Sequence, residues 1–289
     1  MMLSLFVFAL VAFLIVCSST ICSASTQTAV ITGSAGGLGK ALAGHFASLS
    51  CNVVVTARDS VRAEAVAACI GTAHTHPFAL DVTDAKSIDT FKRRCCSQLA
   101  AGGDDHLMLF NNAGVCIEGQ GREVFERTMA VNFWGALAVT KAVLPSMLAA
   151  GKGSVVCVSS GDGELACLSS ALQRELKQAE NTEAVKAVVQ HAVDLAGVAG
   201  VEHAFGATPA YSVSKAALNA VVRLEGEVLM QQNVALTAVC PGDVATAMCS
   251  NPQAAISPEL AAKEVAMIGL HPKKFMGGLF YREREVIPW

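Results

Sequence analysis

The chain alternates between short runs that are apolar throughout and longer stretches in which apolar residues recur at helical spacing. Six runs rich in β-branched residues predict strands at residues 28–32, 52–56, 76–80, 107–110, 154–159 and 234–239. Five helical patterns lie at residues 38–49, 61–68, 86–99, 124–149 and 212–230. Because strands that are apolar throughout must be covered on both faces, this order predicts a parallel sheet between two layers of helices.

One long stretch breaks this rhythm between the fifth strand and the last helix. Residues 170–180 are polar and helix-favouring, and residues 183–195 are amphipathic, so both predict surface helices. We interpret about residues 163–206 as a helical insertion. The expected fold class is therefore α/β, a doubly wound (Rossmann) parallel sheet of about seven strands with this insertion before the helix at 212–230.

The first 24 residues differ in composition from the rest of the chain. Residues 3–17 are almost wholly apolar, and the small residues Cys22 and Ala24 fit a cleavage site before Ser25, although the usual basic residue ahead of the run is absent. The alternative is a signal anchor that associates with a membrane through residues 3–21. We expect residues 1–24 to be a signal peptide or anchor-like leader and residues 25–289 to form a single domain.

Composition excludes some partners and leaves the location contested. A net charge of -3 without a basic patch argues against nucleic acid binding. Nine of the eleven cysteines lie beyond residue 24, an odd number that cannot all pair, which favours a reducing, cytosol-facing environment, whereas the leader favours the secretory pathway or a membrane. Neither the cysteines nor the seven histidines have metal-ligand spacing, so no metal site is expected.

A glycine-rich stretch directly follows the first predicted strand and opens the first predicted helix. It contains Gly33, Gly36, Gly37 and Gly39. A tight strand-to-helix turn needs backbone angles that a Cβ disfavours, and a phosphate can approach the amides at a helix N-terminus only where side chains are missing. The sequence context therefore predicts a diphosphate-binding turn.

Tyr211 and Lys215 have the spacing that stacks a phenol beside an ammonium on one face of a helix. A nearby positive charge stabilises a phenolate and lowers its pKa, so a tyrosine placed in this way can act as a proton donor. Tyr-x-x-x-Lys occurs by accident in many chains. Its meaning depends on the other motifs present.

Five motifs in order resemble the short-chain dehydrogenase/reductase superfamily across residues 27–249. They are Thr32-Gly33-x-x-x-Gly37-Leu38-Gly39, Asn111-Asn112-Ala113-Gly114, Ser160, Tyr211-x-x-x-Lys215 and Pro241-Gly242. The insertion, the turn at residues 56–59 and the C-terminal residues 280–289 are similar to those of the NADPH-dependent carbonyl reductases within that superfamily. The resemblance implies that residues 25–289 form an NAD(P)-binding reductase domain.

The resemblance implies a catalytic group of Asn132, Ser160, Tyr211 and Lys215. Tyr211 would protonate a carbonyl oxygen, and Ser160 would donate a hydrogen bond to the same oxygen as negative charge develops on it. Lys215 would lower the pKa of Tyr211 and hold the nicotinamide ribose, and Asn132 would anchor a water linking Lys215 to solvent. Asn132 has a competing interpretation as an amide that serves a backbone group inside a helix. Ser159 is the alternative candidate for the catalytic serine, but the family pattern Ser-Ser-x-x-Gly favours Ser160.

The resemblance also implies a nicotinamide cofactor. NAD-specific members carry an acidic residue about where Ala57 stands, whereas Arg58 offers a charged fork for a 2′-phosphate and favours NADP(H) over NAD(H). Asp81 would reach the adenine, and Val244 and Thr246 would hold the carboxamide. The expected cofactor-binding residues are Gly33, Ser34, Gly37, Leu38, Gly39, Arg58, Asp81, Val82, Asn112, Ala113, Gly114, Tyr211, Lys215, Pro241, Gly242, Val244 and Thr246.

The function that these expectations favour is NADPH-dependent reduction of an aldehyde, ketone or quinone. Two alternatives stay open: a membrane-associated dehydrogenase that oxidises a lipophilic alcohol of steroid or retinoid type, and a sensor or scaffold that binds NADP without turnover. The partner would be a small-molecule carbonyl or alcohol. Because the resemblance assigns the insertion to the surface through which other members form oligomers, a monomer is expected.

Overall fold

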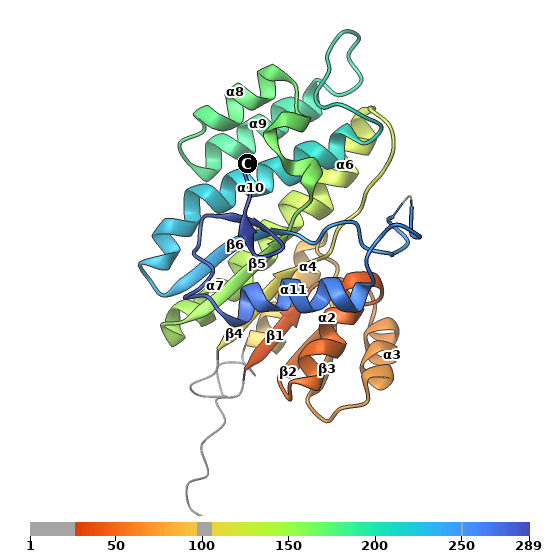
Figure 1. Cartoon of the computed structure of the whole chain (residues 1–289), viewed down its shortest axis with the longest axis vertical. Coiled ribbons are helices and arrows are strands. Elements are labelled where there is room, and N and C mark those ends of the chain that lie inside the picture. The colour runs from red at the N-terminus through yellow and green to blue at the C-terminus, as the bar shows by residue number, and fades with distance from the viewer. Residues whose placement is uncertain (1–26, 97–105, 250) are drawn as a thin grey trace, which may run out of the picture.

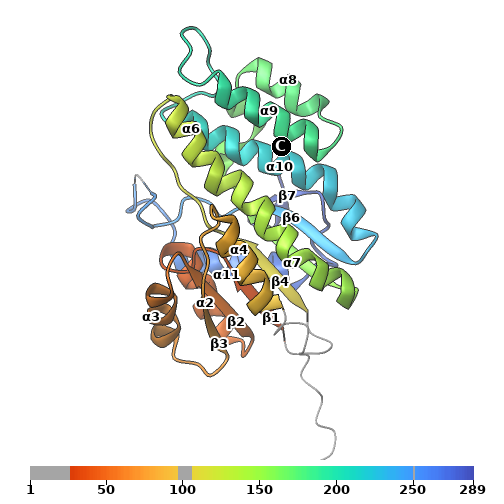
Figure 2. The same ribbon diagram turned by 180° about the vertical axis from the view of Figure 1, so that it is seen from behind.

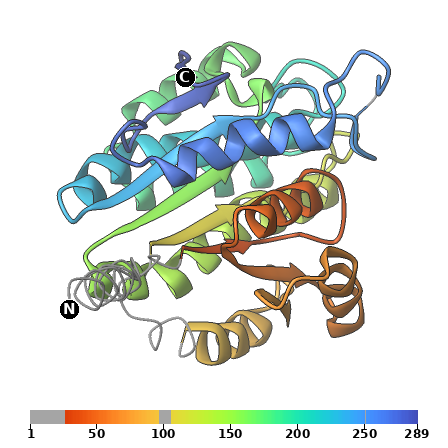
Figure 3. The same ribbon diagram turned by 60° about the horizontal axis from the view of Figure 1, so that its bottom comes forward.

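The computed structural model describes residues 27–96, 106–249 and 251–289. The predicted leader at residues 1–24, including residues 3–21, and the end of the helix predicted at 86–99 therefore lie outside the described residues. The described chain has three layers, with a twisted sheet between two sets of helices (Figures 1 and 3). The α/β doubly wound fold class is confirmed.

The sheet has eight strands in the order β3-β2-β1-β4-β5-β6-β7-β8 rather than the predicted seven or so. The strands are parallel except for β8, which pairs antiparallel with β7. Their bounds are β1 Thr28–Ile31, β2 Asn52–Ala57, β3 Thr75–Ala79, β4 Leu107–Asn111, β5 Gly153–Val158, β6 Val234–Cys240, β7 Phe280–Arg282 and β8 Glu285–Val286. The order reverses between β1 and β4, which makes their carboxyl ends the place where such folds bind ligands.

Helices cover both faces of the sheet. One face carries α2 Gly37–Ser48, α3 Ser60–Ile70 and α11 Pro258–Leu270 (Figure 1). The opposite face, seen in Figure 2, carries α4 Ala85–Phe91, the π-helices η1 Lys92–Cys96 and η2 Ala130–Gly135, α6 Arg122–Met129, α7 Ala136–Ala150 and α10 Pro209–Met230.

Alternate residues of each central strand enter two separate cores. Val30 of β1 and Leu109 of β4 pack with α7 and α10, whereas Ile31 and Phe110 pack with α2 and α11. This alternation follows from the two-residue period of a strand. Because both faces are buried, the strands must be apolar at every position, which is the pattern that made them visible in the sequence.

The helical stretch Arg122–Ala150 is long and apolar enough to cross a membrane by length and composition. Here it packs against β4 and β5. Its buried residues Phe125, Phe133 and Val143 belong to the core between the sheet and α10. In this fold its apolar character is therefore that of a core helix.

The insertion begins with two 3-10 turns and continues with the two helices predicted from the sequence. The elements are η3 Gly161–Gly163, η4 Leu165–Cys167, α8 Ser170–Gln178 and α9 Thr182–Asp194. The side chains of Ser169 and Asn181 cap α8 and α9. Both helices pack on α10, and α9 also contacts α6, so the insertion covers the outer surface of these helices (Figure 1).

Candidate active site

The glycine-rich turn connects β1 to α2 at the centre of the sheet. Gly33 and Gly37 have φ values of +68° and +50°, which L residues rarely adopt. A Cβ on Gly36 would meet nothing within 4 Å, and Gly36 caps α2 without a side-chain hydrogen bond. The space beside the first amides of α2 is therefore open, and a diphosphate would fit there.

Buried polar side chains hold this turn against the neighbouring strands. Thr32 Oγ1 accepts hydrogen bonds from the amides of Asn112 and Ala113, both at 2.9 Å. Asn112 Nδ2 donates to the Thr32 carbonyl oxygen at 2.8 Å, and Ser34 Oγ donates to the Ile31 carbonyl oxygen at 2.7 Å. Ser34 and Asn112 were predicted to bind the cofactor, and their side chains serve the turn itself.

Arg58 and Asp81 follow the adjacent strands β2 and β3. Asp81 Oδ1 accepts hydrogen bonds from the Thr83 amide at 2.9 Å and from Thr83 Oγ1 at 2.7 Å. These bonds, with a smaller contribution from the positive charge of Arg58, lower the pKa of Asp81. Arg58 is exposed. The two side chains lie close enough to interact at the edge where a ribose phosphate and adenine were predicted to bind.

The loop after β6 crosses over the glycine-rich turn. Gly242 has a φ of +76°, and Val244 forms a β-bridge with Ile256. A Cβ on Gly37 would lie 3.0 Å from Thr246 Cγ2, so Thr246 faces the turn. The predicted binding residues of this loop therefore lie beside the predicted phosphate site.

Several predicted cofactor residues line this edge from inside the fold. Leu38, Val82 and Val244 are buried. Ala113 packs against Gly33, where a Cβ would lie 3.0 Å from Ala113 Cα. Half-buried Pro241 ends β6.

Ser160, Tyr211 and Lys215 come together beyond the carboxyl end of β5. The hydroxyl groups of Ser160 and Tyr211 lie within reach of each other. Lys215 lies one turn further along α10 and is buried, and its Nζ donates to the Val158 carbonyl oxygen at 2.7 Å. The Nζ atom lies 5.4 Å from the centre of the Tyr211 ring. Within the described residues, the hydroxyl of the competing Ser159 is buried without a partner, so Ser160 alone of the two faces Tyr211.

Burial controls the ionisation of this group. It raises the pKa of the Tyr211 phenol above its ordinary value, and the nearby Ser160 hydroxyl acts in the opposite direction. Burial lowers the pKa of Lys215 from 10.5 to about 8. The Lys215 amine therefore releases its proton near pH 8. For the pKa of Tyr211, burial has a larger effect than any neighbouring charge.

Asn132 lies in the π-helix η2, close to the same group. Its Oδ1 accepts a hydrogen bond from the Val115 amide at 2.8 Å, and its Nδ2 donates to the Val115 carbonyl oxygen at 2.9 Å and to Ser214 Oγ at 3.0 Å. A Cβ on Gly114 would lie 3.5 Å from Asn132 Oδ1 and 3.7 Å from Lys215 Nζ, so Gly114 lies between them. The side chain joins the loop after β4 to α10, in line with the competing structural interpretation, and its role toward a water stays a prediction.

The structure adds residues that no sequence pattern singled out. Cys116 is exposed, forms a side-chain hydrogen bond with Thr208 and interacts electrostatically with Lys215. Asp162 follows Ser160 by two residues and interacts electrostatically with Tyr211. Asp162 occupies a variable position of the Ser-Ser-x-x-Gly pattern, which explains why the motif did not identify it.

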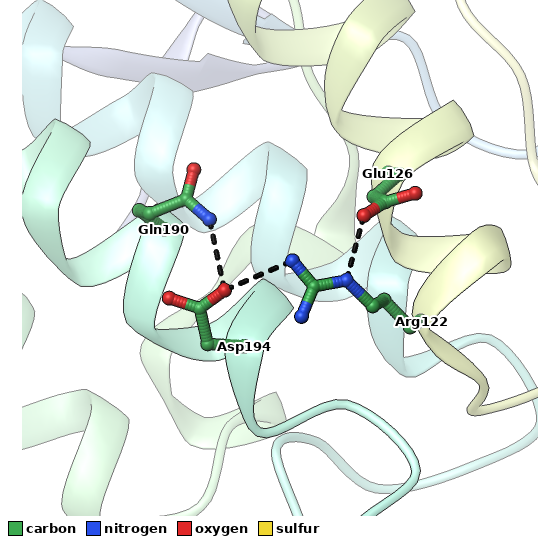
Figure 4. Close-up of polar contacts among 4 residues, drawn as sticks. All are labelled: Arg122, Glu126, Gln190 and Asp194. Atoms are coloured by element: carbon green, nitrogen blue, oxygen red, sulfur yellow. Dashed lines mark hydrogen bonds and ion pairs between the residues drawn. The ribbon is translucent and has the colours of Figure 1, made fainter.

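Exposed polar contacts attach the insertion to the helix that follows the β4 loop. Figure 4 shows Arg122 of α6, whose Nε donates to Glu126 Oε1 at 2.7 Å and whose Nη2 donates to Asp194 Oδ1 of α9 at 3.1 Å. Gln190 Nε2 donates to the same Asp194 oxygen at 3.1 Å. These contacts hold the end of α9 beside the start of α6, close to the loop that carries Cys116.

Comparison with known proteins identifies the family. The sequence profile described as short chain dehydrogenase matches residues 27–172, and the chain belongs to this family of oxidoreductases. A dehydrogenase/reductase SDR family protein 7-like protein of Anopheles gambiae is 34% identical over 148 residues, which are 48% of this chain and 46% of that protein. The match thus spans about half the length of this curated relative.

Two further similarities extend over most of the chain. Carbonyl reductase (NADPH) 1 of Rattus norvegicus is 29% identical over 284 residues, covering 92% of this chain and 100% of that protein. The structure of salutaridine reductase from Papaver somniferum superposes with a TM-score of 0.77 at 24% identity, covering 89% of this chain and 99% of that chain. The second similarity concerns the fold alone.

Proposed function

We propose that this protein reduces an aldehyde, ketone or quinone to an alcohol with NADPH as the reductant. The proximity of the Ser160 and Tyr211 hydroxyl groups, beside buried Lys215, is the observation that carries the proposal. This pair lies at the same sheet edge as the glycine-rich turn. A proton donor and a phosphate-binding surface at one edge suit the protonation of a substrate held beside a dinucleotide.

Tyr211 and Ser160 have complementary roles in the proposed reaction. A carbonyl oxygen would accept hydrogen bonds from both hydroxyls, and negative charge on it would grow as the carbonyl carbon is reduced. Donors fixed in advance stabilise that charge more in the transition state than in the ground state. Tyr211 would then transfer its proton to the oxygen. Bound NADPH would supply the hydride.

Lys215 would assist Tyr211 after cofactor binding. Its amine, whose pKa burial lowers to about 8, can exchange a proton near neutral pH. Its distance of 5.4 Å from the Tyr211 ring lets its charge favour the phenolate. We further propose that Asn132 keeps this group in place by joining the loop after β4 to α10.

The glycine-rich turn and the residues that follow β2 and β3 form the sheet edge that we call the cofactor edge. NADP(H) fits this edge better than NAD(H) does. Gly36 leaves the N-terminus of α2 open, and no acidic side chain stands at Ala57. Exposed Arg58 follows instead and offers a planar fork for a 2′-phosphate. The name of the rat relative is consistent with this preference.

The test is NADPH oxidation with a panel of aldehydes, ketones and quinones, repeated with NADH. Tyr211→Phe should lower kcat by about 10² to 10⁴-fold, as expected for a lost general acid, while NADPH binding measured by fluorescence changes little. The chain has only one other tyrosine, Tyr281, whose hydroxyl donates to the Met276 carbonyl oxygen in the opposite core. Tyr281→Phe is therefore the matched control and should keep kcat. A Tyr211→Phe enzyme as fast as wild type would refute the mechanism.

A second candidate function is oxidation of a lipophilic alcohol by the same group. Exposed apolar side chains favour it. Phe205 is 56% exposed, and its amide donates a hydrogen bond to the Cys167 carbonyl oxygen. Met248 is 50% exposed on the loop that carries Thr246. The same assay run with NADP⁺ and long-chain, steroid and retinoid alcohols distinguishes the two directions. Cofactor binding without turnover in either direction would favour the sensor alternative.

We also propose that the protein is a monomer. The insertion helices α8 and α9 pack on α10, and α9 also packs on α6, so they occupy part of the surface that α10 and α6 would offer to a second copy. Light scattering coupled to gel filtration should give one chain per particle. A dimer would contradict the proposal without affecting the proposed chemistry.

A further inference from the structure

Asp162 holds a fixed position next to the proposed reaction centre. Its backbone amide donates to Ser160 Oγ at 3.2 Å. The next residue, Gly163, packs directly on α10, because a Cβ there would lie 2.8 Å from Lys215 Cβ. The 3-10 turn that carries Asp162 is therefore held between the serine and the helix of Tyr211, while the Asp162 residue itself is exposed.

The Asp162 carboxylate lies within electrostatic range of ionisable groups on several elements around the site. It opposes ionisation of Tyr211 on α10, of Cys116 on the loop after β4 and of Cys167 on η4. Partial burial of the carboxylate raises its own pKa first, and the acids Asp243, on the loop after β6, and Glu164 raise it further. Asp162 thus lies where the loops bordering Ser160 and Tyr211 converge.

The two acids of this turn differ in their partners. Glu164 Oε1 accepts a hydrogen bond from Arg282 Nη2 at 2.6 Å, so its charge is compensated by the last residue of β7. Among the described residues, no side chain or amide donates a hydrogen bond to the Asp162 carboxylate, and none forms an ion pair with it. Asp162 therefore carries an uncompensated negative charge at the mouth of the site, with the acid Asp243 close by.

We propose that Asp162 is a specificity-determining residue that selects against carbonyl substrates carrying an anionic group and favours neutral or cationic ones. The proposal rests on the proposed carbonyl reduction. Any substrate bonded to Ser160 and Tyr211 must place its remaining atoms among the loops that Asp162 borders. Two like charges about 6 Å apart near a protein surface repel enough to change binding by roughly tenfold.

Three para-substituted benzaldehydes test this selectivity: 4-formylbenzoate, 4-nitrobenzaldehyde and 4-(trimethylammonio)benzaldehyde. They share one ring and differ in charge, and dividing each variant's kcat/KM by that of wild type cancels their different intrinsic reactivities. In Asp162→Asn, kcat/KM for the anion should rise about tenfold and that for the cation should fall, while the neutral compound changes little. The differences should shrink at high salt.

Glu118→Gln is the matched control. Glu118 is exposed on the loop after β4, and its charge acts on Cys116 but is not among the groups that shift the pKa of Tyr211. The substitution removes the same charge and should leave the ranking of the three compounds unchanged. An equal shift in Glu118→Gln would mean that net charge rather than Asp162 sets selectivity.

The outcomes separate this inference from the proposed function. If Asp162→Asn changes all three compounds equally, Asp162 acts on the Ser160 turn and the selectivity proposal is overturned. If wild type reduces the neutral aldehyde and Asp162→Asn leaves the charge ranking unchanged, only the inference fails. If wild type reduces none of the three or of the wider carbonyl panel, the proposed function fails and the inference with it.

Discussion

The cofactor edge and the insertion are attached to the same sheet by different kinds of contact. Around the glycine-rich turn, Thr32, Ser34 and Asn112 form hydrogen bonds inside the fold, and Thr32 and Ser34 are fully or almost fully buried. The insertion is joined to α6 through Arg122 and Asp194, whose side chains are 55% and 50% exposed. Both regions border the proposed active site.

This difference indicates which parts of the site tolerate amino-acid substitution. A buried polar group that loses its partner retains its desolvation cost of about 1–3 kcal/mol, so the turn has few alternatives to its present conformation. Exposed ion pairs are solvated in both states and screened by salt, so they restrain a segment only weakly. The cofactor edge should therefore be rigid and intolerant of substitution, and the insertion adaptable.

The largest effect is expected from Gly39→Ala. A Cβ at this position would collide with the Gly33 carbonyl oxygen and lie 2.5 Å from Asn112 Nδ2. Overpacking together with loss of the Asn112 hydrogen bonds should reduce the free energy of unfolding by about 4 kcal/mol. Urea denaturation followed by circular dichroism measures the change.

Gly36→Ala is the control for this prediction. Its Cβ would meet nothing within 4 Å, and its φ of -171° is ordinary extended backbone. We expect stability close to wild type but weaker NADPH binding, because the new methyl group would occupy the surface proposed for the diphosphate. Equal stability of the Gly39→Ala and Gly36→Ala proteins would remove the contrast between the rigid edge and the adaptable insertion.

The buried amine of Lys215 should make the stability of the protein depend on pH. Below about pH 8 its amine is protonated in both folded and unfolded chains, so folding includes the full cost of burying an ammonium. Between about pH 8 and 10.5 the unfolded chain still binds the proton that the folded chain has released, so this group makes stability rise with pH. The gain should be on the order of 3 kcal/mol across that window.

Comparison with Lys215→Met isolates this contribution from the other groups that titrate at high pH. Methionine fills a similar volume without a charge, so its protein should lack the pH-dependent gain. The measurement is the urea midpoint of both proteins at pH 7.5 and 10. Parallel pH dependences would show that the amine is not held in a strongly desolvating site.

The fold was largely predictable because its central strands are buried on both faces. Val53 and Val54 enter opposite cores, so the whole run had to be apolar and was recognised as a strand. β7 and β8 have only three and two residues, too short for a periodic pattern, and this explains why the sheet has eight strands rather than about seven. No helix is predicted for Pro258–Leu270, although Ser257 caps it and Pro258 occupies its first turn, a signal that the sequence contains.

The residues that meet beyond the carboxyl end of β5 could be singled out from the sequence, but their energetics could not. Tyr211 and Ser160 belong to recognisable motifs, and the fold brings them into contact. The prediction that Lys215 lowers the pKa of Tyr211 rested on spacing alone, whereas burial is the larger influence and depends on loops distant in sequence. Asp162 shows the same limit, because its proposed role comes from its nearness to the loops after β4 and β6 rather than from any local pattern.

The smallest effect is expected where the insertion meets α6. Asp194→Asn removes the charge that Arg122 of α6 contacts at 3.1 Å while keeping an oxygen for Gln190. Because the pair is exposed, we expect little change in global stability and about twofold faster amide hydrogen exchange, confined to the end of α9 and the start of α6. Salt should screen the pair, so at high ionic strength wild type and variant should exchange alike.

Glu123→Gln distinguishes loss of the contact between Arg122 and Asp194 from loss of a negative charge alone. Glu123 forms an exposed ion pair with Arg127 at 3.7 Å, but both residues belong to α6, so this pair does not reach the insertion. Its removal should leave exchange in α9 unchanged. If Asp194→Asn also made exchange faster at the glycine-rich turn, or destabilised the protein as much as Gly39→Ala, the insertion would be part of the rigid framework. The loops beside the insertion that border Ser160 and Tyr211 would then be held in place by the fold. Adaptation to different carbonyl compounds would have to come from side chains such as Asp162.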